Sequence, residues 1–254
     1  MAGLFLFFSI TGKIAACFLW THPRLRAFAA LSFLLPDLIL LYQLLIPSAR
    51  GLVPVLTRFA TERNEIWLTI DDGPDAHDTP QILDLLERHQ ARATFFPIGQ
   101  RAAQHPGLIA EILRRGHEVG HHTHTHPLGS FWCASRTRVA RELDEGLAAL
   151  HRGGAQPRWF RGPAGIKNIF LARALAARDL RCVGWNVRSF DSVGRDPAAI
   201  VQRVMRRLRP GAIVLMHEGP ALHPQVRVHA LRLLLEALTG RGFTCVLPRP
   251  EQLR

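Results

Sequence analysis

The chain has 254 residues, of which 48% are hydrophobic, so it can bury a full core and general disorder is excluded. Its formal charge of +12 raises the question of nucleic acid, but only Lys13 and Lys167 are lysines, which leaves 30 arginines among 32 basic residues. These arginines are scattered and form no stripe with interleaved aromatic residues, so we expect no nucleic-acid partner. We interpret them as a solvated surface with a secondary attraction to anionic lipid.

Two apolar stretches, Leu4–Trp20 and Ala27–Ile46, lie at the start of the chain, and each has roughly membrane-spanning length, about 17–25 residues. A short polar turn, residues 21–26, separates them. A cleaved signal peptide fits less well, because a positive n-region is missing and a second apolar stretch follows the first. We therefore predict a hydrophobic helical hairpin that contacts membrane lipid through residues 1–48, and we assign residues 1–58 to a membrane-associated segment.

Each apolar stretch contains one charged residue near its middle, Lys13 in the first and Asp37 in the second. In an antiparallel hairpin that turns near Pro23, their depths differ by about 6 Å at 1.5 Å per residue, which a lysine can bridge. We therefore predict a Lys13–Asp37 ion pair within a spanning hairpin. The alternative is a pair of helices that lie on the bilayer surface.

The arginines near the hairpin give conflicting signals about its orientation. Arg24 and Arg26 in the turn favour a cytoplasmic loop, which places the rest of the chain outside, whereas Arg50 and Arg58 favour the reverse. The chemistry described below favours attachment to a bacterial inner membrane, with the catalytic domain facing the periplasm.

From residue 60 onward, strand-like apolar runs alternate with amphipathic helical runs. The expected strands are Glu65–Asp71, Ala93–Gly99, His117–Thr123, Arg158–Gly162, Arg181–Val187, Ala212–Glu218 and Phe243–Leu247. Strands that alternate with helices at this spacing predict a parallel sheet, and seven such units favour a barrel over an open sheet. We therefore expect residues 59–254 to form one α/β domain, an irregular seven-stranded (β/α) barrel.

The first expected strand ends in two adjacent carboxylates, Asp71 and Asp72, which are followed by Gly73 and Pro74. Acidic residues and proline are poor continuations of a central strand. Neighbouring residues at a strand end project differently, so one carboxylate could bind a metal while the other stays free as a base. The alternative is an Asp-Gly-Pro turn with solvated acids.

The third expected strand runs into a segment with four histidines within six residues, at positions 121, 122, 124 and 126. This density is hard to explain by core or surface packing, although a solvated histidine-rich loop is an alternative. Neutral imidazoles together with an aspartate suit zinc or a similar divalent ion, and three protein ligands plus water are typical of a catalytic site. The spacing itself does not select which histidines are ligands.

Three further polar residues lie at or after the ends of later strands: Arg161 and His217 at strand ends, and Asp191 after a strand. Taken singly, they can be explained as a surface ion pair, a helix cap and a strand-end histidine. However, all the polar residues described above lie at the carboxyl ends of their expected strands, the face on which barrel enzymes build their active sites. This shared position predicts one active site.

These residues resemble the motifs of the NodB-like polysaccharide deacetylases, carbohydrate esterase family four, over about residues 62–254. The family motif T-F-D-D-G-P is matched by residues 69–74, with Ile70 in place of phenylalanine. This match implies that Asp71 is the catalytic base and Asp72 a metal ligand.

The second family motif, H-[ST]-x-x-H, is matched by residues 122–126. The resemblance therefore implies that His122 and His126 complete the metal site, while His121 and His124 stay outside it. The cofactor expected from this match is a divalent metal ion, Zn²⁺ in the first place.

The remaining motifs are matched less completely. In residues 160–165, which correspond to F-R-P-P-Y-G, Arg161 would orient the base, and Ala164 replaces the tyrosine whose backbone N–H serves as oxyanion donor. Residues 215–218 correspond to L-L-H-D and retain the acid histidine, His217.

The match to D-x-x-D-W, at residues 188–192, departs most from the family. Asp191, which tunes the acid histidine in the family, is retained, but Arg188 replaces the first acid and Ser192 the pocket tryptophan. The resemblance thus implies a complete reaction centre and an altered sugar-binding wall.

The resulting prediction is a metal-dependent hydrolase that removes N-acetyl groups from amino sugars of a polysaccharide, oligosaccharide or envelope glycan. One alternative keeps the chemistry and changes the substrate to a lipid-linked sugar precursor, which the hairpin and the missing tryptophan favour. Another is a membrane-bound glycan-binding protein that has lost catalysis, which the altered motifs permit and the retained reactive residues oppose.

Overall fold

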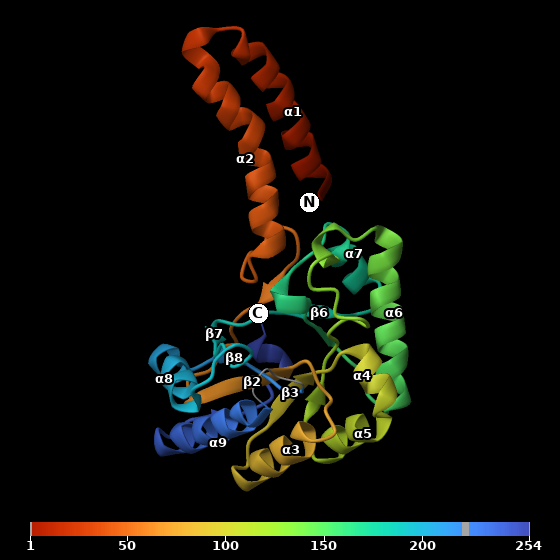
Figure 1. Ribbon diagram of the computed structural model, residues 1–254, viewed down its shortest axis with the longest axis vertical. Helices are drawn as coiled ribbons and strands as arrows, with labels where there is room; N and C mark the ends of the chain where they lie inside the picture. Colours follow the sequence, from red (N-terminus) through yellow and green to blue (C-terminus); the bar gives the residue numbers. More distant parts are fainter. Residues whose placement is uncertain (1, 220–223, 254) are drawn as a thin grey trace.

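The computed structural model describes residues 2–219 and 224–253, in which a helical hairpin projects from an α/β body (Figure 1). The hairpin consists of α1 (Ala2–Trp20), the 3-10 helix η1 (Pro23–Leu25) and α2 (Arg26–Leu45). By length and composition one helix, Pro23–Leu45, could cross a membrane, whereas the apolar helix Phe7–Trp20 is shorter. The predicted hairpin is present, and within the described residues one of its two apolar helices has full membrane-spanning length.

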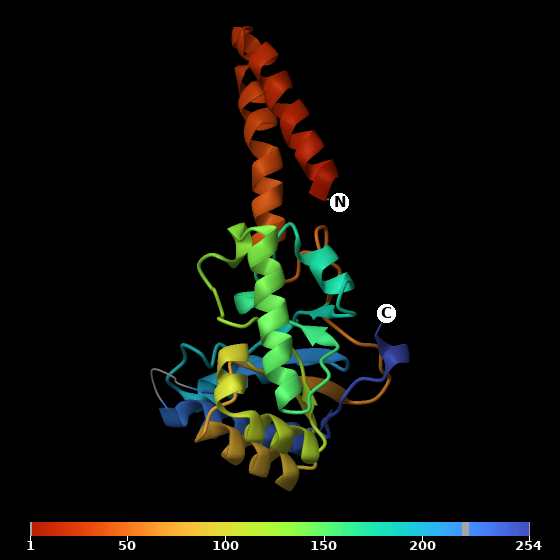
Figure 2. The ribbon, with the colours of Figure 1, turned by 90° about the vertical axis from the view of Figure 1, so that its right-hand side faces the viewer.

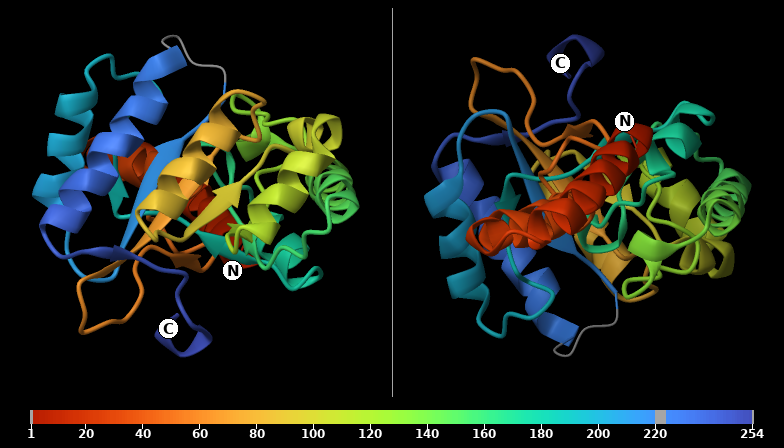
Figure 3. Two further views of the ribbon diagram at one scale, coloured as in Figure 1. Left: turned by 90° about the horizontal axis from the view of Figure 1, so that it is seen from below. Right: turned by 90° about the horizontal axis from the view of Figure 1, so that it is seen from above.

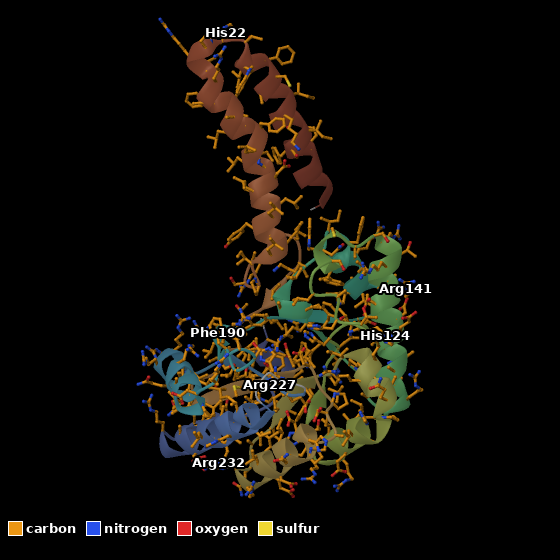
Figure 4. The ribbon with its side chains drawn as sticks, in the orientation of Figure 1. His22, His124, Arg141, Phe190, Arg227 and Arg232 are labelled. Carbon is orange, nitrogen blue, oxygen red and sulfur yellow. The ribbon has the colours of Figure 1, made fainter. Side chains whose placement is uncertain are left out.

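The two hairpin helices pack closely around a central ion pair. A side chain at Gly12 would place its Cβ 2.7 Å from the carbonyl oxygen of Ser32, so glycine permits the close approach. Lys13 Nζ lies 2.9 Å from Asp37 Oδ2, which confirms the predicted pair. Most of the large hydrophobic side chains that are exposed in the described part of the chain lie on this hairpin, with His22 at its far tip (Figure 4).

A parallel six-stranded sheet forms the centre of the body. Its strands are β2 (Glu65–Asp71), β3 (Ala93–Phe96), β4 (Glu118–Val119), β7 (Val187–Arg188), β8 (Ala212–His217) and β9 (Thr244–Cys245). Their order is β4-β3-β2-β8-β7, with β9 paired to the start of β2. A second parallel sheet has the order β1-β6-β5, and its strands are β1 (Val55–Leu56), β5 (Trp159–Phe160) and β6 (Arg181–Val183).

The two sheets form an open barrel rather than the seven-stranded barrel that the sequence predicted. The expected strand Arg181–Val187 is two strands, β6 and β7, and β1 is an additional strand within the segment that we assigned to the membrane. A bridge between His121 and Phe160 joins the sheets on one side. On the other side, no ladder links β7 to the second sheet within residues 2–219 and 224–253.

Seven helices cover the body: α3 (Asp78–Arg88), α4 (Gly99–Gln104), α5 (Pro106–Arg114), α6 (Arg136–Arg152), α7 (Leu171–Ala176), α8 (Pro197–Arg207) and α9 (Pro224–Gly240). Helices α3, α5 and α9 lie beneath the six-stranded sheet in Figure 1 and in front of it when seen from below in Figure 3, whereas α8 lies at one side of the sheet. Period-two alternation along β2 directs residues 66, 68 and 70 towards these helices and residues 67, 69 and 71 towards the barrel interior.

The base of the hairpin is fixed to the loop that follows β5 and the 3-10 helix η3 (Pro163–Gly165). Lys167, almost fully buried, donates from its backbone N–H to Leu44 O at 2.8 Å and from Nζ to Ile46 O at 2.6 Å. A Cβ at Gly165 would lie 2.6 Å from Pro47, so glycine is needed for this approach. The strands run across the direction of the hairpin, so their carboxyl ends open to the side of the molecule (Figure 2).

Candidate active site

The carboxyl ends of β2 and β8 bring two of the predicted site residues together. Asp71 and His217 are register partners on these adjacent parallel strands, whose backbones lie about 4.8 Å apart. Both side chains project from the same face of the sheet, because cross-strand partners share a face. The register therefore brings Asp71 and His217 together at one edge of the sheet.

Next to this pair, the side chains of Asp72, His122 and His126 converge. Asp72 Oδ1 lies 3.5 Å from His122 Nε2 and 3.4 Å from His126 Nε2, and the candidate ligand atoms all lie within 4.8 Å of one another. Asp72 and His126 both have left-handed backbones, with φ of 74° and 54°. Such conformations are costly for non-glycine residues and often occur at functional sites.

The protonation of these three side chains suits a divalent cation. His122 Nδ1 lies 2.7 Å from the carbonyl oxygen of Arg161 and donates to it, which leaves Nε2, the nitrogen nearest Asp72, as the ring atom that can bind a metal ion. Burial lowers the pKa of His126 to about 4, which keeps its imidazole neutral. Burial alone would raise the pKa of Asp72, but the neighbouring imidazoles hold it well below its ordinary value.

Asp72 Oδ1 is buried and has no hydrogen-bond partner among the described residues. An ionised oxygen in this position needs a counter-charge, since a buried charge without a partner is expensive. Two imidazole nitrogens and one carboxylate oxygen are donors that Zn²⁺ accepts. The residues present therefore fit a divalent metal ion.

The structure separates the four clustered histidines into two pairs. His122 and His126 converge on Asp72, whereas His121 Nε2 lies 2.9 Å from Leu143 O and His121 Nδ1 accepts from Thr123 N–H. His124 turns away towards α6, where its Nε2 lies 3.7 Å from Glu145 Oε2. In Figure 4 His124 lies near α4 and α6, on the opposite side of the strand ends from Phe190.

Arg161 fixes Asp71 in a buried ion pair. Its Nη1 donates to Asp71 Oδ1 at 2.6 Å and to Thr69 Oγ1 at 2.9 Å. The other guanidinium nitrogens donate to the carbonyl oxygens of Val183 and Gly184. Because Arg161 occupies Oδ1, the second oxygen of Asp71 stays free, 3.8 Å from His122 Nε2.

Asp191 holds His217 in a similar way on the other side of the site. Asp191 Oδ1 lies 2.7 Å from His217 Nδ1, and its Oδ2 accepts from the His217 backbone N–H at 2.8 Å. Burial alone would lower the pKa of His217, but the Asp191 carboxylate outweighs it and raises this pKa above its ordinary value near 6.5. The imidazole can therefore hold a proton at neutral pH.

Several supporting residues are not among the predicted site residues. Glu142 on α6 accepts from the backbone N–H groups of His124 and Thr125, which shapes the histidine loop. Arg101 on α4 donates to the backbone oxygen of Asp72. Glu218 is fully buried, with Oε2 2.5 Å from Thr79 Oγ1, and burial raises its pKa to about 8. Of these, Arg101 has no signal in the sequence, whereas Glu142 is an acid on the buried face of an amphipathic helix and Glu218 is the last residue of the match to L-L-H-D.

Comparison with known proteins agrees with this geometry. Residues 59–183 match the family model described as polysaccharide deacetylase. The chain is 37% identical over 216 residues to a chitooligosaccharide deacetylase from Bradyrhizobium sp., a match that covers 76% of this chain and 96% of the relative. It is 34% identical over 183 residues to a peptidoglycan-N-acetylglucosamine deacetylase from Bacillus cereus, covering 71% and 84% of the two chains.

The fold also matches a solved structure. A family 4 carbohydrate esterase from Streptomyces lividans, solved in complex with acetate, superposes with a TM-score of 0.67 at 32% identity. The superposition covers 77% of this chain and 97% of the esterase. On the strength of these matches, the chain belongs to the polysaccharide deacetylase family, the family 4 carbohydrate esterases.

Proposed function

We propose that this protein is a metal-dependent hydrolase that removes N-acetyl groups from the amino sugars of a glycan and releases acetate. The relatives are named for chitooligosaccharides and for N-acetylglucosamine in peptidoglycan, which supports this substrate class. The observation that carries the proposal is the pairing of Asp71 with His217 on adjacent strands, beside a cluster of Asp72, His122 and His126. This arrangement supplies a base, an acid and a metal site in one place.

Asp72, His122 and His126 would hold the ion, which we propose to be Zn²⁺. When bound, such an ion polarises the acetyl carbonyl and lowers the pKa of its water. Asp71 would act as base, because Arg161 holds Oδ1 and leaves Oδ2 facing the ligand cluster.

The proposed reaction moves one proton on each side of the amide. Asp71 accepts a proton from the attacking water as the new C–O bond forms. His217 then donates its proton to the nitrogen as the C–N bond breaks, which yields acetate and a free amine. The Ala164 backbone N–H is the proposed donor to the developing oxyanion.

The test is acetate release by the full chain in neutral detergent, measured on chitooligosaccharides, peptidoglycan and lipid-linked amino sugars. Removal of metal by a chelator should abolish release, and Zn²⁺ should restore it. Release that survives chelation would contradict metal dependence. Activity on none of these substrates, with the protein folded and metal bound, would instead favour the glycan-binding alternative.

Replacing Asp191 with asparagine is expected to shift the alkaline limb of the kcat/KM profile to lower pH by about one unit or more. The acid form of His217 is active, so activity falls as pH rises through its pKa, and losing the adjacent anion lowers that pKa. Asp196→Asn is the control, because asparagine also caps α8 and the profile should not move. An unchanged limb in Asp191→Asn would refute the assignment of His217 as acid.

We propose that the hairpin inserts in a bilayer and that the catalytic domain faces the periplasm. Its ion pair is about 40% exposed, on a surface of otherwise apolar side chains that the body does not cover. Outside the hairpin, Trp132 and Phe170 are also exposed, on segments that Asn168 links through hydrogen bonds to Phe131 O and Trp132 O. These segments adjoin Lys167, which holds the base of the hairpin. Exposed aromatic side chains beside the base of a membrane hairpin suit the headgroup region of a bilayer.

Replacing Lys13 with leucine should reduce the fraction of the full chain that resists alkaline extraction from membranes. The substitution leaves Asp37 unpaired in the apolar hairpin, at a cost of at least about 2.5–3.5 kcal/mol. The double variant Lys13→Leu/Asp37→Leu should recover wild-type extraction. Better retention of the single variant than of the wild-type chain would sink the spanning arrangement.

A lipid-linked sugar is the second candidate substrate, and one contact favours it. The base of the hairpin touches the loop that contains Ala164 and Gly165, through Pro47 and the Lys167 hydrogen bonds. A substrate anchored in the same bilayer would therefore have its sugar close to the proposed reaction centre. Hydrolysis of lipid-linked sugars together with inactivity on soluble oligomers would select this candidate.

A further inference from the structure

Arg188 lies at the end of the edge strand β7 and faces the barrel interior. Its neighbour Val187 is buried in the core between the six-stranded sheet and the helices that cover it. Side chains alternate along a strand, so Arg188 projects from the opposite face, as Asp71 and His217 do. Arg188 is the register partner of Leu215, two residues before His217. Since β7 lies two strands from β2, the backbone of Arg188 is about 10 Å from that of Thr69, which lies two residues before Asp71 on β2.

Aromatic rings connect Arg188 to the reaction centre. Its guanidinium carbon lies 5.9 Å from the centroid of Trp185, and that same ring lies 5.5 Å from the guanidinium carbon of Arg161. On its other side Arg188 lies 4.6 Å from the centroid of Phe190. Phe190 is 38% exposed and has a left-handed backbone, with φ of 62°.

A second arginine approaches the same ring. Arg203 on α8 lies with its guanidinium carbon 5.4 Å from the Phe190 centroid and donates from Nη1 to Ser189 O at 2.8 Å. Within residues 2–219 and 224–253, no carboxylate oxygen lies within 4.0 Å of either guanidinium. The nearby acid, Asp191, is fully engaged by His217 and Ser189.

The charges of Arg188 and Arg203 are therefore unbalanced beside the reaction centre. Arg188 Nε is buried and makes no hydrogen bond to the described residues. The two terminal nitrogens of its guanidinium group also make no hydrogen bond to these residues. The two guanidinium groups lie near one aromatic ring without an acid beside them, so they repel each other. An oxyanion bound between or beside them would cancel this electrostatic repulsion. A planar guanidinium offers such an anion two parallel N–H groups.

We propose that Arg188, assisted by Arg203, forms a subsite for an anionic group on the substrate, a phosphate or a carboxylate carried by the N-acetylated sugar. The inference rests on the proposed function, because the sugar's amide must reach Asp71 and His217. It goes further in naming the substrate class as anionic glycans rather than neutral oligomers. The competing explanation is that Arg188 is an inward-pointing charge that protects an edge strand from pairing.

The first experiment compares kcat/KM for matched substrates: N,N′-diacetylchitobiose, its 1-phosphate, and a disaccharide that contains N-acetylmuramic acid. We expect the wild-type chain to prefer at least one anionic substrate by about tenfold or more, and the preferred one identifies the anion. Arg188→Gln should lose at least tenfold more activity on that substrate than on the neutral disaccharide. Arg203→Gln should show a smaller loss of the same kind.

Arg207→Gln is the matched control, because Arg207 is an exposed arginine on the same helix as Arg203. It removes one positive charge and should leave the preference unchanged. Equal losses on charged and neutral substrates in Arg188→Gln, or no anionic preference in the wild-type chain, would overturn the subsite while leaving the deacetylase function intact.

A binding measurement keeps the two proposals separate. N-acetylglucosamine 1-phosphate is titrated calorimetrically into the full chain in neutral detergent with chelator present, so that no metal can capture the phosphate. Binding that weakens at least tenfold in Arg188→Gln, but not in Arg207→Gln, supports the subsite even if no deacetylation is found. Binding that is equal in all variants overturns it. So does the absence of binding by the wild-type chain when N-acetylglucosamine 1-phosphate, diacetylchitobiose 1-phosphate and the muramic disaccharide are each titrated.

Discussion

Asp71→Asn is expected to lower kcat for deacetylation by about 10²–10⁴-fold, which is the usual contribution of a general base. Asparagine keeps an oxygen that can accept the 2.6 Å hydrogen bond from Arg161, but it cannot take up the proton of the attacking water. The metal ligands are untouched, so the variant should bind Zn²⁺ with the wild-type stoichiometry. Acetate release and bound metal are measured on the same preparation.

Asp75→Asn is the control for this substitution. Asp75 follows the same strand, and its Oδ1 accepts from the backbone N–H groups of His77 and Asp78, a role that asparagine can fill. Its turnover should match that of the wild-type chain. Substantial turnover by Asp71→Asn, or loss of metal from it, would refute the assignment of Asp71 as base rather than ligand.

Replacing Arg161 with methionine should lower the free energy of unfolding by about 3–5 kcal/mol, the largest stability effect we expect from one substitution in the body. The side chains of Arg161 and Asp71 are 1% and 4% exposed, so removing the cation leaves a buried carboxylate without its partner. It also leaves the carbonyl groups of Val183 and Gly184 without their donors. Thermal unfolding of the full chain should show a melting temperature lower by roughly 10 °C.

Two further variants test the reason for this loss. In Asp71→Asn/Arg161→Met the uncompensated charge is absent, so the double variant should be more stable than the two single effects predict together. Arg114→Met removes an ion pair to Glu111 on the surface, at the same distance of 2.6 Å, and should cost no more than about 1 kcal/mol. Equal destabilisation by Arg114→Met and Arg161→Met would mean that burial does not set the cost.

The same buried pair shows what local sequence patterns can and cannot determine. Asp71 and Asp72 stand out because acids followed by Gly-Pro do not continue a central strand, and the density of histidines at positions 121–126 stands out as well. Motif spacing then singled out His122 and His126, and the convergence of their side chains on Asp72 is consistent with that choice. The contacts of the other two histidines, a hydrogen bond from His121 to Leu143 O and the approach of His124 to Glu145, connect segments about 20 residues apart and have no pattern in the sequence.

The barrel shows the same difference between features that local sequence patterns predict and features that depend on distant residues. Alternation of apolar strands and amphipathic helices predicted the strands that surround the site, because this periodicity is local. It could not predict that residues 181–188 divide between two sheets, or that the barrel stays open there, because strand pairing depends on partners far along the chain. The additional strand β1 has the same origin: two residues, Val55 and Leu56, become a strand only because β6 lies beside them.

The sequence by itself determined the hairpin, the rhythm of strands and helices, and which reactive residues lie at strand ends, since hydrophobic periodicity and motif spacing record these features locally. The tertiary structure alone decided what surrounds them: Glu142 and Arg101 behind the metal cluster, the contact of the hairpin with the loop of Gly165, and two unpaired arginines at the ring of Phe190. These contacts join residues distant in the chain, and their energies depend on burial and on charges that only the folded protein brings together.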